Sequence, residues 1–211
     1  MKKIFTLLLS IFVVTMVWAQ APEGEFAKFE TAPEIDGVVD DVWTEATVYN
    51  IDKPYREEVP TVGEEGETTW QGGWVEGQGV YILLKVTDDA FYPHYAAGSA
   101  NSWEYDKPEI YFDVNFILED GRGAGTDGTG NGSGHYQIAP GFTDGSNDGT
   151  PMTQDNGVVY AFMVDGTNYI GEYFIPFTLL LDGDGNEVAK TDPIGFDVTI
   201  IDRDPDDTAR R

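Results

Sequence analysis

The segment from Val80 to Val86 constrains the fold of this chain more than any other, because it is apolar on both faces. One face carries Val80, Ile82, Leu84 and Val86, and the other carries Tyr81, Leu83 and Lys85. Alternation with a period of two residues is typical of a β-strand, and a strand that is apolar on both sides is covered on both sides. We therefore expect this segment to be a central strand of a sheet.

A second strand is predicted from Glu109 to Phe116, where only one face is apolar. The apolar positions are Ile110, Phe112, Val114 and Phe116, and they alternate with Glu109, Tyr111, Asp113 and Asn115. This is the pattern of a half-buried strand. A face that belongs to the core and a polar face that is free for a ligand thus meet in one segment.

The rest of the chain adds short strands and turns. Val158–Val164 and Tyr169–Ile175 flank Asp165-Gly166-Thr167-Asn168, which predicts an Asp-Gly hairpin. Ile194–Ile201 is the last clear strand. Since no long amphipathic helix is evident, the fold class that we expect is an all-β antiparallel β-sandwich formed by a single domain.

The N-terminus has the features of a secretory signal peptide over residues 1–19. Lys2 and Lys3 precede an apolar run from Ile4 to Val17 that is too short to span a membrane comfortably. The mature chain is therefore expected to be exported, with residues 20–211 as its single domain. The sequence stops soon after its last strand, so we also expect that the domain is truncated at its C-terminal end.

Composition limits the partners and the means of stabilisation. The chain has no cysteine, so this exported domain folds without disulfides. Its net charge is -26, with 38 acidic and 12 basic residues, and becomes -28 when Lys2 and Lys3 leave with the signal peptide. Such a surface repels nucleic acid and anionic membranes, whereas it suits Ca²⁺ or neutral sugars as ligands. An acidic surface that serves only solubility is the alternative.

Two tryptophans have different predicted roles. Trp103 lies in a polar segment just before the Glu109 strand. An indole beside carboxylates can stack on a sugar ring while the carboxylates accept hydrogen bonds from the hydroxyl groups of the sugar. The alternative, equally favoured, is that Trp103 fills the edge of the sandwich. Trp43, which follows the Asp36-Gly37 turn, is predicted to be a core anchor.

Two further carboxylates are candidates for special roles. Asp88 lies two residues after the central strand, and oxygen ligands at a strand end suit Ca²⁺, although a plain turn is the alternative. Glu172 lies inside the second hairpin strand, where a carboxylate either faces solvent or is held by specific partners.

The order of these landmarks resembles the family 9 carbohydrate-binding modules. The resemblance runs over about residues 33–204 and rests on Ile35-Asp36-Gly37 to Trp43, Val80 to Val86 with Asp88, Trp103 to Asp113, Tyr136-Gln137, Glu172 to Pro176, and Ile194 to Asp202. The resemblance implies a β-sandwich that contains structural Ca²⁺. It also implies that the module binds the reducing-end sugar of xylan or cellulose between two tryptophans.

The resemblance implies that Trp103 is the first clamping residue, that Glu109 contacts sugar hydroxyls, and that Asp88 is a metal ligand. Our candidate ligand site is Trp103, Glu109, Tyr111 and Gln137, and our candidate metal ligands are Asp88 and Asp36. Two departures stand out. Gln137 follows Tyr136 where sugar-binding members carry an arginine, and the second clamping tryptophan is not found before Arg211.

Three functions follow. The first is non-catalytic binding of polysaccharide, with a glycoside hydrolase or a larger parent chain as partner. The second is a structural or interaction domain that has lost sugar binding. The third is a glycoside hydrolase, which is disfavoured because Glu109 and Asp113 on one strand face lie roughly 13 Å apart, too far for either hydrolytic geometry.

Overall fold

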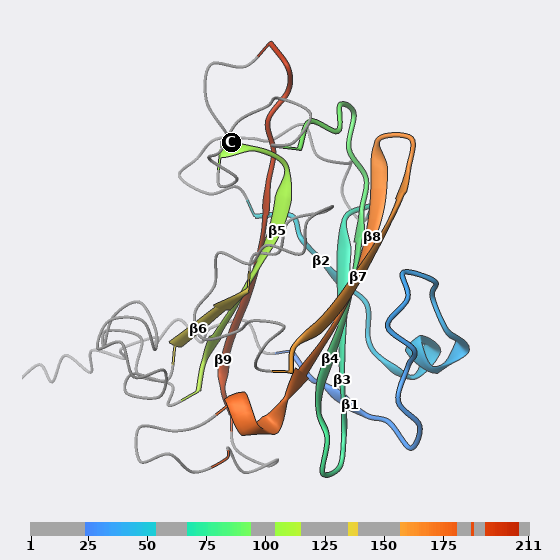
Figure 1. The fold of residues 1–211 in the computed structure, drawn as a ribbon, viewed down its shortest axis with the longest axis vertical. Coiled ribbons are helices and arrows are strands. Elements are labelled where there is room, and N and C mark those ends of the chain that lie inside the picture. Colours follow the sequence, from blue (N-terminus) through green and yellow to red (C-terminus); the bar gives the residue numbers. More distant parts are fainter. Residues whose placement is uncertain are drawn as a thin grey trace, which may run out of the picture.

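The computed structural model describes residues 24–53, 67–93, 104–114, 135–138, 157–180, 187 and 193–206. These residues form two facing β-sheets, which confirms the predicted β-sandwich (Figure 1). The predicted signal peptide at residues 1–19 lies outside the described residues. None of the described helices is long and apolar enough to cross a membrane.

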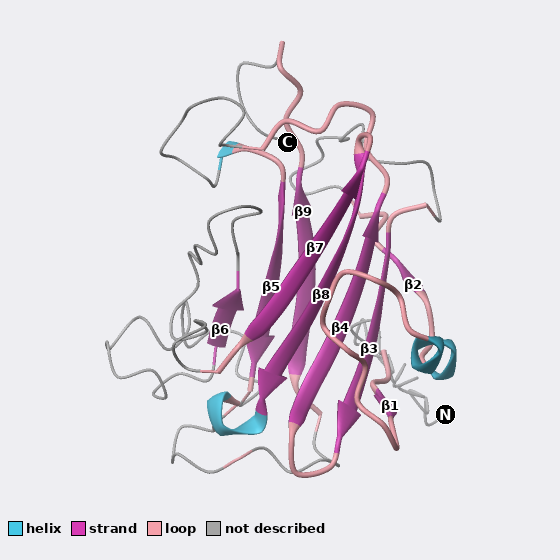
Figure 2. Ribbon diagram, turned by 45° about the vertical axis from the view of Figure 1, so that its right-hand side comes forward, coloured by secondary structure: helices cyan, strands magenta, loops and turns pink. Residues whose placement is uncertain are grey.

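The larger sheet has six strands and the smaller has three (Figure 2). The larger sheet consists of β1 (Ala27–Lys28), β2 (Tyr49–Asn50), β3 (Thr69–Val75), β4 (Gly79–Val86), β7 (Val159–Asp165) and β8 (Asn168–Pro176), in the order β1-β3-β4-β8-β7 with β2 also paired to β3. The smaller sheet has the order β6-β5-β9, formed by β6 (His135–Ile138), β5 (Lys107–Asp113) and β9 (Gly195–Ile201). Strand pairs are antiparallel except for β1 with β3, which is parallel.

Strand β4 is the central strand that its sequence predicts. It pairs with β3 on one side and β8 on the other. Ile82 and Leu84 belong to the core between the two sheets, and Tyr81 and Leu83 belong to a second core on the outer face of the larger sheet. Both faces of β4 are apolar because each one is covered by a different layer.

The second core is closed by the N-terminal segment of the described chain. Phe29 and Trp43 pack there edge to face, with ring centroids 5.5 Å apart, and each is 1% exposed. Trp43 lies in the short 3₁₀ helix η1 (Asp41–Glu45), beside the outer face of the larger sheet (Figure 1). The prediction that Trp43 is a core anchor is therefore confirmed.

The predicted Asp-Gly hairpin is also confirmed. Strands β7 and β8 meet at the pair Asp165 and Asn168, with Gly166 and Thr167 between them. Gly166 has φ of 67°, a conformation that glycine adopts without the steric cost of a Cβ atom. Strand β8 then leads into the 3₁₀ helix η5 (Phe177–Leu179).

Strand β5 differs from its prediction only at its ends. It begins at Lys107 and ends at Asp113, whereas alternation in the sequence extends from Glu109 to Phe116. Ile110 and Phe112 are fully buried in the core between the sheets, as the pattern requires. Residues beyond Val114 in this segment lie outside the described residues.

Candidate functional site

The smaller sheet has an outer face on which three of the predicted ligand residues come together. Along β9, Phe196, Val198 and Ile200 pack in or against the core, so the alternating residues Asp197 and Thr199 belong to the opposite face. The register places Glu109 opposite Thr199, and Tyr111 opposite Asp197.

Strand β6 completes this face on the other side of β5. Gln137 pairs with Tyr111, so Gln137, Tyr111 and Asp197 form a row across the three strands. Residues that are directly opposite one another share a face of the sheet. We call the residues Glu109, Tyr111, Gln137 and Asp197 the outer-face row. Trp103, the fourth predicted ligand residue, lies outside the described residues.

Glu109 is held by its own strand. Its carboxylate accepts a hydrogen bond from the Tyr111 hydroxyl, and its other oxygen lies 4.0 Å from the Lys107 ammonium. Glu109 is 7% exposed and Lys107 is 2% exposed, whereas Tyr111 is half-buried. Because a buried charge needs a partner, the Lys107–Glu109 pair is an internal part of this face. Tyr111 lies outward of it.

A second group of polar residues lies where three strands end. Asp88 follows β4, Asp106 precedes β5 and Asp202 follows β9, and each contributes a carboxylate oxygen within 4.8 Å of the others. Lys107 pairs with Ile201, so the start of β5 and the end of β9 are adjacent. This acidic cluster is buried, with Asp202 fully inaccessible. Three buried carboxylates so close together repel one another unless protons or a cation neutralise them.

The environment of the cluster shifts its titration. Burial raises the pKa of Asp106 to about 7, and backbone hydrogen bonds from Tyr92 and Arg203 oppose that rise. Burial likewise raises the pKa of Asp88 to about 6, and the nearby charges of Asp202, Asp89 and Asp204 add to it. Oxygen donors, burial and mutual repulsion are the conditions under which a hard divalent cation binds, so these residues fit Ca²⁺.

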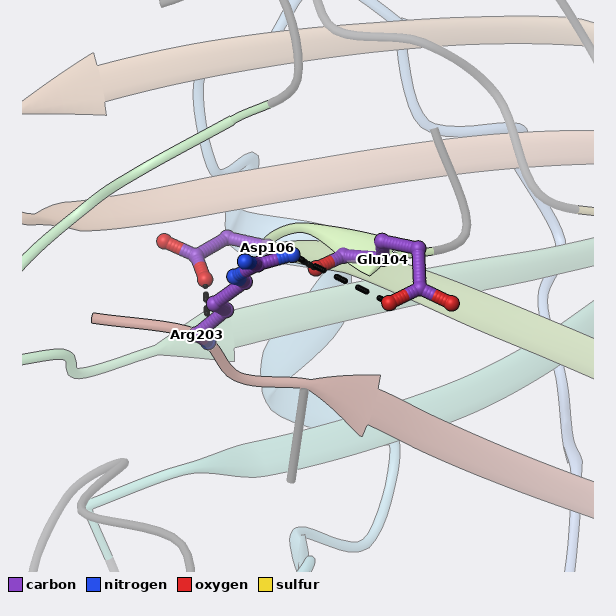
Figure 3. A network of polar contacts seen from close by, with 3 residues as sticks. All are labelled: Glu104, Asp106 and Arg203. Atoms are coloured by element: carbon purple, nitrogen blue, oxygen red, sulfur yellow. Dashed lines mark hydrogen bonds and ion pairs between the residues drawn. The ribbon is translucent and has the colours of Figure 1, made fainter. Parts of the chain in front are cut away.

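Arg203 ties the cluster to the segment before β5 (Figure 3). Its backbone N–H donates to Asp106 Oδ1 at 2.7 Å, and its guanidinium donates to the backbone oxygen of Glu104 at 3.3 Å. The guanidinium also lies 3.8 Å from the Glu104 carboxylate and 4.6 Å from the centroid of the Tyr105 ring. One residue thus holds all three positions of the segment from Glu104 to Asp106.

Asp36, the other predicted metal ligand, is not part of the acidic cluster. Its carboxylate accepts from the backbone N–H of Val38 at 2.8 Å, within its own turn. Its backbone N–H faces the carboxylate of Glu172, which also accepts from Gly37 N–H at 2.8 Å and from the Trp43 indole at 3.0 Å. Asp36 and Glu172 therefore belong to the anchorage of the N-terminal segment.

The sequence did not single out three residues of these sites. Asp202 directly follows a predicted strand, a signal like the one that pointed to Asp88, whereas Asp106 lies three residues before the predicted start of its strand at Glu109. The proximity of Asp106 and Asp202 depends on the pairing of β5 with β9. Asp197 interrupts an apolar strand, and the alternation of β9 would have placed it on the polar face.

The described residues define a β-sandwich module with one polar sheet face and a buried acidic cluster at its end. The sequence model of the family described as "Carbohydrate family 9 binding domain-like" matches residues 35–211, and the chain belongs to this family. Its resemblance to the family 9 modules is thereby confirmed. No curated protein matches the chain.

Solved structures with the same fold include two of a family 9 carbohydrate-binding module from Caldicellulosiruptor kristjanssonii. The structure in complex with cellotriose has a TM-score of 0.62 at 14% identity, over 90% of this chain and 81% of that one. The structure in complex with glucose has a TM-score of 0.58 at 16% identity, over 87% and 80%. At this identity the comparison supports the shared fold.

Proposed function

We propose that this protein is a non-catalytic carbohydrate-binding module for neutral plant-type polysaccharide, either xylan or cellulose chains or their ends. The observation that carries the proposal is the outer-face row, in which a phenol and carboxylates lie on adjacent strands of one sheet face and Gln137 is in register with them. Such groups donate and accept hydrogen bonds as sugar hydroxyls do, and a tyrosine ring adds an apolar surface for a pyranose. The binding of cellotriose and glucose by related modules supports it.

The proposed action is binding without hydrolysis. Glu109 is engaged by Lys107 and Tyr111, and Asp113 on the same strand face lies roughly 13 Å from it, beyond the carboxylate spacing of glycosidases. Hydrolysis would then come from a glycoside hydrolase, either a separate enzyme or another part of a larger parent chain. Export through residues 1–19 would place the module where such polysaccharides occur.

Calorimetric titration with xylo- and cello-oligosaccharides tests the proposal. We expect binding in the range typical of an exposed platform, with loss of most affinity in Trp103→Ala and a clear reduction in Tyr111→Ala. Tyr160→Ala is the matched control, because Tyr160 is also a half-buried strand tyrosine but lies in the larger sheet. Equal affinity of all variants, or release of reducing sugar by the purified chain, would contradict the proposal.

The engagement of Glu109 by its own strand favours one alternative, a structural or interaction domain that has lost sugar binding. Gln137 in place of the family arginine points the same way. The same titration decides between them. A folded protein that binds none of the oligosaccharides would favour the interaction domain.

We propose further that Asp88, Asp106 and Asp202 hold a structural Ca²⁺. Each carboxylate supplies one or two oxygens, and Ca²⁺ completes about six to eight with carbonyl groups or water. A bound cation would remove the repulsion between three buried carboxylates and so stabilise the folded state.

Thermal unfolding in Ca²⁺ and in chelator tests this site. We expect saturating Ca²⁺ to raise the unfolding midpoint by about 5 °C or more, and Asp202→Asn to remove most of that shift. Asp36→Asn is the comparison variant. If part of the shift is lost there, Asp36 holds a second ion, and if the wild-type midpoint does not respond to Ca²⁺, the metal proposal is wrong.

A further inference from the structure

The outer face of the smaller sheet carries two kinds of carboxylate that differ in their availability to a ligand. Glu109 is 7% exposed, and its oxygens face Tyr111 and Lys107 of the same strand. Asp197 is exposed and lies directly opposite Tyr111 on the neighbouring strand. A ligand that approaches the ring of Tyr111 therefore meets Asp197 before it meets Glu109.

Resting on the proposed function, we infer that Asp197 is the carboxylate on this face that accepts hydrogen bonds from sugar hydroxyl groups. Its negative charge then sets a preference for neutral over acidic sugars. A carboxylate accepts two hydroxyl donors at once, as a vicinal diol provides. A uronate in the same position would bring a second negative charge against Asp197, which is unfavourable even in a solvated site.

The position of Asp197 favours this role over that of a solubilising residue. It lies on the edge strand β9 at one end of the row, directly opposite the half-buried ring of Tyr111, and its strand neighbours Phe196 and Val198 fix its orientation by packing on the core. The positive charge of Lys107 is 2% exposed and lies against Glu109, so it offers little compensation to an acidic ligand.

The experiment compares two ligands that differ by one charge. Cellotriose and the same trisaccharide carrying one glucuronate are titrated into the full chain and into Asp197→Ala, Asp197→Asn and Asp165→Asn. Asp165 is an exposed residue at the β7–β8 turn of the larger sheet, so Asp165→Asn removes the same net charge away from the site. Unfolding midpoints of all variants show whether the fold is kept.

We expect Asp197→Ala to weaken cellotriose binding about 5- to 20-fold. Asp197→Asn keeps an acceptor, so its cellotriose affinity should fall less than about 3-fold, while its neutral-to-acidic affinity ratio narrows about 3- to 10-fold. Asp165→Asn should change neither value.

Full cellotriose affinity in Asp197→Ala would overturn this inference alone. An unchanged ratio in Asp197→Asn, or an equal change in Asp165→Asn, would overturn the charge preference. A wild-type chain that binds neither sugar would overturn the proposed function and this inference with it.

Discussion

The indole N–H of Trp43 donates to a carboxylate oxygen of Glu172 at 3.0 Å, although 129 positions separate the two residues in the sequence. Glu172 lies on the central part of the larger sheet and is fully buried. The backbone N–H groups of Asp36 and Gly37 donate to its other oxygen. This carboxylate therefore joins the N-terminal segment to the sheet, and the second core depends on it.

Removal of this carboxylate should destabilise the protein strongly. Glu172→Ala leaves three donors without their acceptor in a buried site, for which we expect a loss of about 3 to 5 kcal/mol in the free energy of unfolding. Trp43→Phe keeps an aromatic ring and loses one donor, so about 2 kcal/mol is expected. Urea unfolding measures both values. Glu30→Ala, at an exposed position, is the control, and a loss under 1 kcal/mol in Glu172→Ala would contradict the anchoring role.

Two glycines of one hairpin should respond differently to substitution by alanine. A Cβ atom at Gly79 would overlap the backbone oxygen of Ile175 on the paired strand, whereas one at Gly77 would meet no atom within 4 Å. Gly77 has φ of 73°, so Gly77→Ala costs only backbone strain, about 1 kcal/mol. We expect Gly79→Ala to cost about 3 kcal/mol, because the β4–β8 pairing must shift. Chemical denaturation measures the free energy of unfolding of the two variants. Similar losses of stability in Gly77→Ala and Gly79→Ala would contradict the prediction and show that the β4–β8 pairing accommodates the added Cβ atom.

A buried hydroxyl offers a stabilising substitution. Tyr173 is fully buried, and its hydroxyl has no hydrogen-bond partner in the part of the chain that the structure describes. Its ring packs edge to face on Phe162, so Tyr173→Phe keeps the packing and removes an unsatisfied polar group. We expect the free energy of unfolding to stay constant or to rise by up to about 1 kcal/mol. A loss above 1 kcal/mol in denaturant titration would mean that the hydroxyl has a bound water or another partner.

The acidic cluster predicts how stability depends on pH in the absence of Ca²⁺. Burial raises the pKa of Asp106 from 3.8 to about 7 and that of Asp88 from 3.8 to about 6. The folded state therefore binds more protons than the unfolded state between about pH 4 and 7, and its stability falls as pH rises through that window.

Asp106→Asn isolates the pH dependence, because asparagine does not titrate; it keeps one of the two oxygen acceptors, and the loss of the other lowers stability equally at every pH. In chelator, we expect the wild type to lose on the order of 2 kcal/mol more than Asp106→Asn between pH 4 and pH 8. Added Ca²⁺ should restore the wild type most at high pH, where the carboxylates are ionised. Parallel pH profiles of the two proteins in chelator would contradict the raised pKa of Asp106.

Local patterns predicted much of this fold, and pairings between distant segments account for most of what they missed. Strand β4 and the β7–β8 hairpin follow from alternation and from an Asp-Gly turn, which act within a few residues. The parallel strand β1 comprises Ala27 and Lys28, too short to show any period. The sequence of β8 does not decide whether Glu172 faces solvent or specific partners, because those partners lie in the Asp36-Gly37 turn and in η1, more than a hundred residues earlier.

In the candidate sites too, local patterns predicted some features, and pairings between distant segments determine the others. Alternation placed Glu109 and Tyr111 on one polar face, and the register of β5 and β6 brought Gln137 beside them. That Glu109 would be buried against Lys107 could not be read from the sequence, because both residues belong to a face that alternation marks as polar. Asp106 and Asp202 meet Asp88 only because the ends of β5 and β9 lie together near the end of β4.

The two faces of β5 also bear on how this module can diverge. Core residues such as Ile110 and Phe112 alternate with Tyr111, which lies on the other face, so the half-buried Tyr111 can change without altering the core. If this face binds sugar as proposed, ligand preference can change through mutation of its exposed and half-buried positions, while the core positions keep the shape of the sandwich. Modules that share this fold at 14% to 16% identity are the outcome expected when the core pattern is kept while individual residues change.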